Sequence, residues 1–183
     1  MTDEAFADDK DWTWVLNELC SECEYDVREF DVTEISGLIR ESAAEWVAVM
    51  AETEGETLRQ RPREDRWSAL EYACHVRDVF ALYNYRLGLM LNEVGPHYPN
   101  WNQDETAVEK NYGESDPAEV SAELAENAAA LARHFDTVKE DDWERTGFRS
   151  DGAAFTVESF ARYLIHDPMH HMWDVQSGLA ALQ

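Results

Sequence analysis

The chain has 183 residues, enough for one domain with a substantial core, and a formal net charge of −24 at pH 7. That charge repels nucleic acid and anionic lipid at long range, which argues against a protein that binds a phosphate backbone. No run of residues approaches the roughly 20 apolar residues of a membrane span. The acidic surface is most simply a well-solvated one, and it also fits a cationic partner or a high-salt cytoplasm.

Residues 1–30 are acidic and aromatic, and we expect an N-terminal arm or a short helix packed on the body. The start, Met1 to Glu4, lacks the basic and apolar regions of a signal peptide, which predicts a cytoplasmic protein. Cys20 and Cys23 have the spacing of half a zinc site or of a redox pair, but the simpler interpretation is two ordinary cysteines in a packed arm. A structural zinc site needs four ligands, and the sequence has no second pair of this kind. Three cysteines without an export signal disfavour a disulfide framework.

A first helix is predicted over about residues 33–53, where apolar residues recur at helical spacing. Asp31 and Glu34 have the spacing of a capping box at its start. Gly55 follows the pattern as a stop signal.

The second predicted helix begins at the capping box of Ser68 and Glu71 and runs to about residue 93. Trp67, just before the cap, is placed to pack on Tyr72. His75 lies two turns in, near the edge of the apolar face.

Residues 95–115 form the longest irregular stretch, which predicts either an ordered lid over a site or a loop packed on the body. Trp101 and Asp104 in this stretch are candidates to line a binding pocket. A third helix is predicted to begin at Pro117, the proline at the first position after the cap Asp116.

The last predicted helix begins after Thr156, carries His166, His170 and His171, and ends at Gly178. The sequence shows no convincing strand. Four long helices and two substantial loops predict an all-α four-helix bundle over residues 31–183, preceded by the arm of residues 1–30.

His166 and His170 are four residues apart, so on a helix both imidazoles can reach one metal ion. Metal sites in bundles are built from inward-facing side chains on facing helices, and His75 is the other histidine inside a strong helix. Three neutral imidazoles would bind Zn²⁺, Ni²⁺, Fe²⁺ or Cu²⁺ and leave an open position, which is typical of a catalytic site. Three carboxylates are candidates to hold the second ring nitrogens of these histidines: Asp78, Asp167 and Asp174.

Spacing alone leaves a second interpretation open, in which the histidines are core residues with hydrogen-bond partners. His171 lies about 100° around the helix from His170, so we expect it outside the metal site, facing another helix or solvent. By the same argument Cys74, beside His75, is predicted to be a packing residue. Pro168 removes a helical hydrogen bond to Leu164 and predicts a kink between the two ligands.

Two motifs resemble the DinB-like superfamily, which includes mycothiol-dependent isomerases and related thiol transferases. They are the segment from Trp67 to Asp78 and the segment from Leu164 to His171. The resemblance implies a four-helix bundle with a three-residue metal site, in which the second helix gives one histidine and the last helix gives an H/E-x-x-x-H pair. It maps that site onto His75, His166 and His170. Zinc or nickel, and a homodimer, are what the resemblance implies.

The function expected from this reading is a metal-dependent S-transferase, in which a low-molecular-weight thiol such as mycothiol attacks an electrophilic small molecule. Hydrolysis by a hydroxide generated at the metal is a variant of it. The alternative is a non-catalytic metal-binding or stress-related bundle. Nucleic-acid and membrane partners are not expected.

Overall fold

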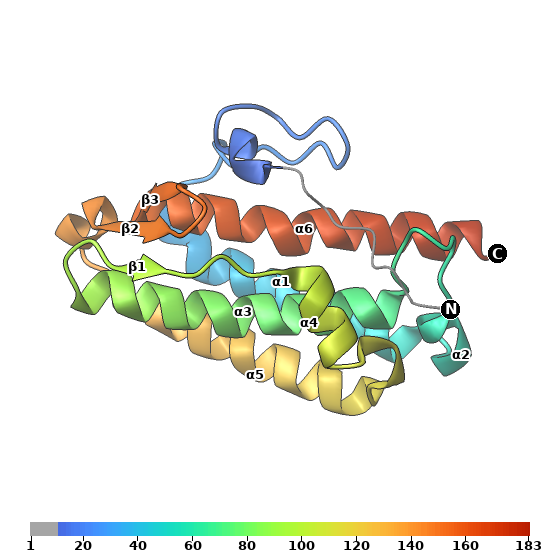
Figure 1. The fold of residues 1–183 in the computed structure, drawn as a ribbon. Helices are drawn as coiled ribbons and strands as arrows, with labels where there is room; N and C mark the ends of the chain where they lie inside the picture. Colours follow the sequence, from blue (N-terminus) through green and yellow to red (C-terminus); the bar gives the residue numbers. More distant parts are fainter. Residues whose placement is uncertain (1–10) are drawn as a thin grey trace.

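The computed structural model describes residues 11–183, and the chain folds into a four-helix bundle, as the sequence predicted (Figure 1). The long helices are α1 (Ile35–Glu52), α3 (Ala69–Asn92), α5 (Pro117–Phe135) and α6 (Val157–Ala181). The shorter helices are η1 (Trp12–Leu16), η2 (Val32–Glu34), α2 (Gly55–Arg59), α4 (Gln103–Glu109), η3 (Tyr112–Glu114) and η4 (Glu140–Glu144). The core lies between the long helices and includes the fully buried side chains of Trp46, Phe80, Leu124 and Phe160.

Local signals fix the starts of three of the long helices, α3, α5 and α6. Ser68 and Glu71 form the predicted capping box of α3, and the ring of Trp67 packs on Tyr72 with their centroids 5.4 Å apart. Asp116 and Thr156 cap α5 and α6. The capping box predicted at Asp31 and Glu34 is wrong, because Asp31 caps the 3-10 turn η2 and Glu34 gives no return bond.

Two glycines that were expected to end helices, Gly55 and Gly178, lie within helices instead. Gly55 is the first residue of α2, while α1 has already ended at Glu52. Gly178 lies inside α6, where a Cβ would come within 3.2 Å of Cγ of Pro62. The glycine therefore allows the loop before α3 to approach the end of α6 closely.

A small sheet closes one end of the bundle, which corrects the expectation of no strand (Figure 1). β2 (Thr146–Arg149) pairs parallel with β1 (His97–Tyr98) and antiparallel with β3 (Ala154–Thr156). Strands of two to four residues are too short for an alternating pattern to be visible in the sequence. The sheet ties the two long connections together and positions Tyr98 and Arg149.

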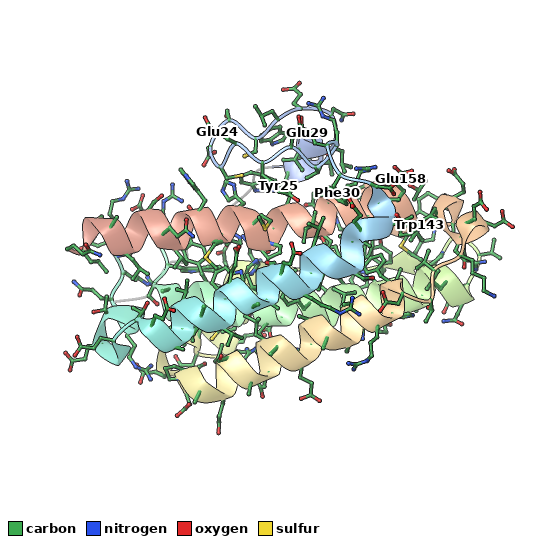
Figure 2. All side chains as sticks on the ribbon, turned by 180° about the vertical axis from the view of Figure 1, so that it is seen from behind. Glu24, Tyr25, Glu29, Phe30, Trp143 and Glu158 are labelled. Carbon is green, nitrogen blue, oxygen red and sulfur yellow. The ribbon has the colours of Figure 1, made fainter. Side chains whose placement is uncertain are left out.

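The N-terminal arm lies on α6 (Figure 1). The guanidinium of Arg162 on α6 donates hydrogen bonds to the carbonyls of Val27 and Phe30. Figure 2 shows the outer side of the arm, where Glu24 and Glu29 are exposed to solvent. The expected start of the arm, including the acidic N-terminus, lies outside the described residues. Within residues 11–183 no helix is both long and apolar enough to cross a membrane.

Helix α6 runs through Pro168 as one helix. The indole N–H of Trp46 on α1 donates a hydrogen bond of 3.2 Å to the carbonyl of Pro168. α6 is thereby held against α1 next to the histidine-rich segment.

Candidate functional site

Four titratable side chains in the middle of α6 point to two different places. Asp167 and His171 lie with His75 of α3, and we call these three the central group. His166 and His170 lie with two cysteines of the arm, and we call Cys20, Cys23, His166 and His170 the sulfur group. In each group the candidate ligand atoms are all within 4.8 Å of one another.

The expected trio of His75, His166 and His170 is therefore divided between the two groups. Both 166/170 and 167/171 have the i, i+4 spacing that brings two side chains together on a helix. Neighbouring residues point about 100° apart, so only one of the pairs can face α3. The packing of α6 turns Asp167 and His171 toward His75, so His171 faces another helix, α3, which is one of the two surroundings expected for it.

The central group lies between α3 and α6. Nε2 of the fully buried His75 is 3.2 Å and 3.3 Å from the two carboxylate oxygens of Asp167. The ring of His171 meets the ring of His75 edge-on, with centroids 4.9 Å apart. His75 also stacks on Trp101, with centroids 5.2 Å apart and an interplanar angle of 8°. These contacts fix the imidazole of His75 in one orientation.

Asp174 fixes the tautomer of His171. Its Oδ2 lies 3.0 Å from Nδ1 of His171, and an ionised carboxylate only accepts hydrogen bonds. Nδ1 therefore carries the proton, and in the neutral ring Nε2 has the lone pair that a metal ligand needs. Asp174 is held in turn by Arg66, at 2.9 Å.

Asp78 does not hold an imidazole, and this part of the prediction is wrong. Its carboxylate accepts hydrogen bonds from the hydroxyl of Tyr112 at 2.6 Å, from Lys110 at 2.7 Å and from Arg77 at 2.9 Å. One turn from His75 on α3, Asp78 thus binds the segment after α4 and contacts neither group.

The charge distribution keeps Asp167 ionised. Burial alone would raise the pKa of this carboxyl, but His75 and His171 beside it hold the pKa well below its usual range. Two imidazoles and one carboxylate are the donor set of several catalytic zinc sites, which keep an open position for water or substrate. The residues of the central group therefore fit a divalent ion.

A cavity of about 760 Å³ adjoins both groups. Trp101 and Asp104 line it, as the sequence suggested for the long loop. Its wall also includes Arg86 and Arg149, which the sequence did not single out, together with Trp12 of the arm. A volume of this size is typical of small-molecule sites.

Arg86 is a buried cation, and its side chain forms no ion pair within residues 11–183. The residue is 4% exposed, its guanidinium donates a 2.7 Å hydrogen bond to the carbonyl of Pro99, and it lies over the ring of Tyr98 at 4.8 Å. By contrast, Arg149 is paired with Asp151 at 2.8 Å. Because a buried charge is costly without a counter-charge, Arg86 marks a place where an anionic group of a ligand would be stabilised.

The sulfur group joins the arm to α6. Sγ of Cys20 is 3.6 Å from Nδ1 of His170, and Sγ of Cys23 is 3.7 Å from Nε2 of His166. Burial, followed by the charge of His170, lowers the pKa of His166 to about 4, so its imidazole is neutral near pH 7. Both cysteines of the arm thus lie beside histidines that follow them in the chain by 150 and 143 residues.

The third cysteine belongs to neither group. Cys74 is buried, and its thiol lies 3.7 Å from the carbonyl of Tyr112, to which it donates. It is a packing residue, as its position beside His75 on the helix predicted.

Comparisons with known proteins agree with this fold. A sequence model described as the DinB superfamily matches residues 38–175. Among solved structures, the chain is similar to YfiT from Bacillus subtilis, described as a probable metal-dependent hydrolase with an unusual four-helix bundle topology. The TM-score is 0.74 at 19% identity, over 85% of this chain and 91% of YfiT.

The chain is also similar to the mycothiol-dependent maleylpyruvate isomerase and to a point mutant of it. Both comparisons give a TM-score of 0.66 at 12% identity, covering 81% of this chain and 62% of the isomerase. At these identities the likeness establishes the fold. Comparison with curated proteins gives no match.

Proposed function

The chain belongs to the DinB superfamily, and on that premise we propose that it is a metal-dependent enzyme acting on an anionic small molecule. His75, Asp167 and His171 would hold the metal, a divalent ion such as zinc or nickel. The nucleophile in this proposal is a low-molecular-weight thiol, mycothiol or a similar compound, which attacks an electrophilic carbon of the substrate. This ligand set replaces the trio expected from the sequence.

One observation carries the proposal: the central group adjoins a cavity of about 760 Å³ whose wall contains the buried cation Arg86. A divalent ion bound by the central group would supply Lewis-acid chemistry and lower the pKa of a thiol or water beside it. The cavity gives room for two small molecules or for one larger conjugate.

The chain's own residues have separate roles in this mechanism. Asp174 keeps the proton of His171 on Nδ1, and Trp101 holds the ring of His75 by stacking. Arg86 binds an anionic group of the substrate and thereby orients its electrophilic carbon. When the sulfur–carbon bond forms, the thiol proton goes to solvent or to the product, and any leaving group departs with the bonding electrons.

A second candidate is hydrolysis, with water in place of the thiol. The ligand atoms of the central group favour hydrolysis, because two histidines and a carboxylate are also the ligands of zinc peptidases. The description of YfiT as a probable metal-dependent hydrolase points the same way. A metal-binding bundle without catalytic activity is the third candidate, and the experiment below separates all three.

The test uses purified protein loaded with one metal at a time. Conjugation of electrophilic carboxylic acids is followed with a panel of thiols, and hydrolysis of esters and amides is followed without thiol. We expect metal-dependent conjugation that is lost in His75→Ala and His171→Ala. Hydrolysis that needs no thiol would select the second candidate, and bound metal without either activity would select the third.

His97→Ala is the matched control, because His97 is an exposed histidine on β1 that belongs to neither group. Its metal content and activity should equal those of the wild type. Unchanged metal content and activity in both His75→Ala and His171→Ala would contradict the assignment of the central group. We further propose that the protein acts in the cytoplasm as a homodimer, and light scattering of the purified protein tests the dimer.

A further inference from the structure

The sulfur group is a second set of metal donors, separate from the central group. Its four side chains come from two parts of the chain, the turn of the arm at residues 20–24 and the middle of α6. Cys20 is fully buried, and His166 and His170 are 4% and 5% exposed. Nothing in the proposed reaction uses these cysteines.

The turn of the arm directs both thiols toward α6. The amide of Glu24 donates a 2.9 Å hydrogen bond to the carbonyl of Cys20, and the amide of Cys20 donates to the carbonyl of Tyr25. Glu24 has a φ of 58°, a left-handed conformation that is uncommon outside glycine. The chain thus reverses within a few residues, and Cys20 and Cys23 both reach histidines of α6.

The distances agree with tetrahedral coordination. With bonds of about 2.3 Å to sulfur and about 2.0–2.1 Å to nitrogen, a tetrahedral ion separates a sulfur and a nitrogen ligand by about 3.6 Å. Cys20 Sγ and His170 Nδ1 are 3.6 Å apart, and Cys23 Sγ and His166 Nε2 are 3.7 Å apart. Each pair therefore has the separation that two ligands of one zinc ion have.

The charges also balance. On binding, Cys20 and Cys23 would each release a proton to solvent, and the two thiolates would cancel the charge of Zn²⁺. The two imidazoles bind in their neutral form. A neutral complex suits a place where an isolated charge would be costly to bury.

We propose that Cys20, Cys23, His166 and His170 bind one zinc ion that fastens the N-terminal arm to α6. Two cysteines and two histidines fill all four positions, as in structural zinc sites, so this ion would have no open position for a substrate.

The ion would also shape the cavity beside the central group. Trp12 of the arm packs on the rings of His166 and His170, with centroid distances of 5.7 Å and 4.9 Å. Trp12, Thr13 and Leu16 line the cavity. A zinc ion that holds the arm on α6 would therefore keep one wall of the cavity in place.

X-ray absorption at the zinc edge of the wild-type protein is the direct test. We expect sulfur scatterers at about 2.3 Å together with nitrogen scatterers at about 2.0–2.1 Å. The sulfur signal should persist in His75→Ala, which separates this site from the central group. Zinc bound without sulfur, or a Cys20–Cys23 disulfide that persists in reductant with no zinc bound, would overturn the proposal.

Variants give an independent test. Cys20→Ser with Cys23→Ser should lose about one zinc per chain and should be cleaved faster by trypsin after Arg28, which lies in the arm. Cys74→Ser is the matched control and should keep its zinc and its resistance to cleavage. His166→Cys, which makes a three-cysteine, one-histidine set, should retain the zinc. Wild-type zinc content in the double variant would overturn the proposal.

Discussion

Oδ2 of Asp174 lies 3.0 Å from Nδ1 of His171. The same oxygen is 3.7 Å from Nε2 of His170, one helical turn earlier. One carboxylate thus lies between the two candidate metal groups. Of the two groups, only the central group has a ring nitrogen within hydrogen-bond distance of the Asp174 carboxylate. The central group is therefore the one that depends on Asp174.

Asp174→Asn should weaken metal binding by the central group about 10- to 100-fold, the usual effect of removing a carboxylate that orients a histidine ligand. The reason is that an amide can present either its oxygen or its N–H to Nδ1, so the tautomer of His171 is no longer fixed. Competition titration against a chromogenic chelator measures the change.

Asp78→Asn is the control for Asp174→Asn, because Asp78 is another largely buried carboxylate with three hydrogen-bond partners. It contacts neither group, so this variant should lose about 1–3 kcal/mol in the free energy of unfolding and keep its metal affinity. Equal affinities for Asp174→Asn and the wild type would contradict the role of Asp174.

Glu71→Gln should reduce the free energy of unfolding by about 1–2 kcal/mol at pH 7. Burial alone would raise the pKa of Glu71, but its ion pair with Arg61 and its bond to the amide of Ser68 hold the pKa below the ordinary value. Such a carboxylate stabilises the fold fully above its unfolded-state pKa and loses that contribution as the pH falls through its folded-state pKa. The difference between wild type and variant should be constant above about pH 5.5 and shrink below about pH 4.

Urea unfolding at several pH values measures the effect of Glu71→Gln. Asp65→Asn is its control, since the Arg63–Asp65 pair is exposed and screened by solvent and should contribute little to the stability at any pH. A loss in Glu71→Gln that grows toward low pH would contradict the assigned sign.

Gly147→Ala should lower the free energy of unfolding by about 1–3 kcal/mol through overpacking. A Cβ on Gly147 would lie 2.8 Å from Cγ of Met90 and 3.0 Å from the ring of Tyr98, so these side chains or β2 would have to shift. Gly37→Ala in α1 meets nothing within 4 Å and should raise the stability by about 0.5–1 kcal/mol. Thermal unfolding of the two variants checks the opposite signs; the same sign for both would be the contrary result.

Arg86→Gln should raise KM for an anionic substrate about 10- to 100-fold, with a smaller effect on kcat, because a charged hydrogen bond contributes about 1.5–3 kcal/mol. Glutamine keeps the aliphatic stem and a polar amide at this position but lacks the charge and the Nη2 that bonds the carbonyl of Pro99. Arg145→Gln removes a cation that bonds carbonyls of Met90 and Glu93 and does not line the cavity. Steady-state kinetics should show no change in KM for Arg145→Gln, and an equal rise in both variants would argue against Arg86 as the substrate contact.

The bundle could be predicted from the sequence because its helices carry strong local signals. The Ser68 and Asp116 caps each fix a helix start within a few residues, and both act as predicted. The short strands could not be predicted, because β1 pairs with β2 across about 50 residues and strands of two to four residues show no alternating pattern in the sequence.

The candidate site was only partly predictable, for a geometric reason. His166 to His171 contains two overlapping i, i+4 pairs, and local spacing cannot tell which one faces α3. That choice follows from how α6 packs as a whole. Likewise, the sequence could not show which side chains lie beside Cys20 and Cys23. These are His166 and His170 of α6, and only the folding of the arm onto α6 brings the four together.

The most direct test of the central claim is a crystal structure of the metal-loaded protein with an anomalous difference map collected at the absorption edge of the bound metal. We predict a peak within bonding distance of Nε2 of His75, a carboxylate oxygen of Asp167 and Nε2 of His171. A single peak that joins His75 to His166 and His170, or no peak beside His75 at saturating metal, would contradict the account.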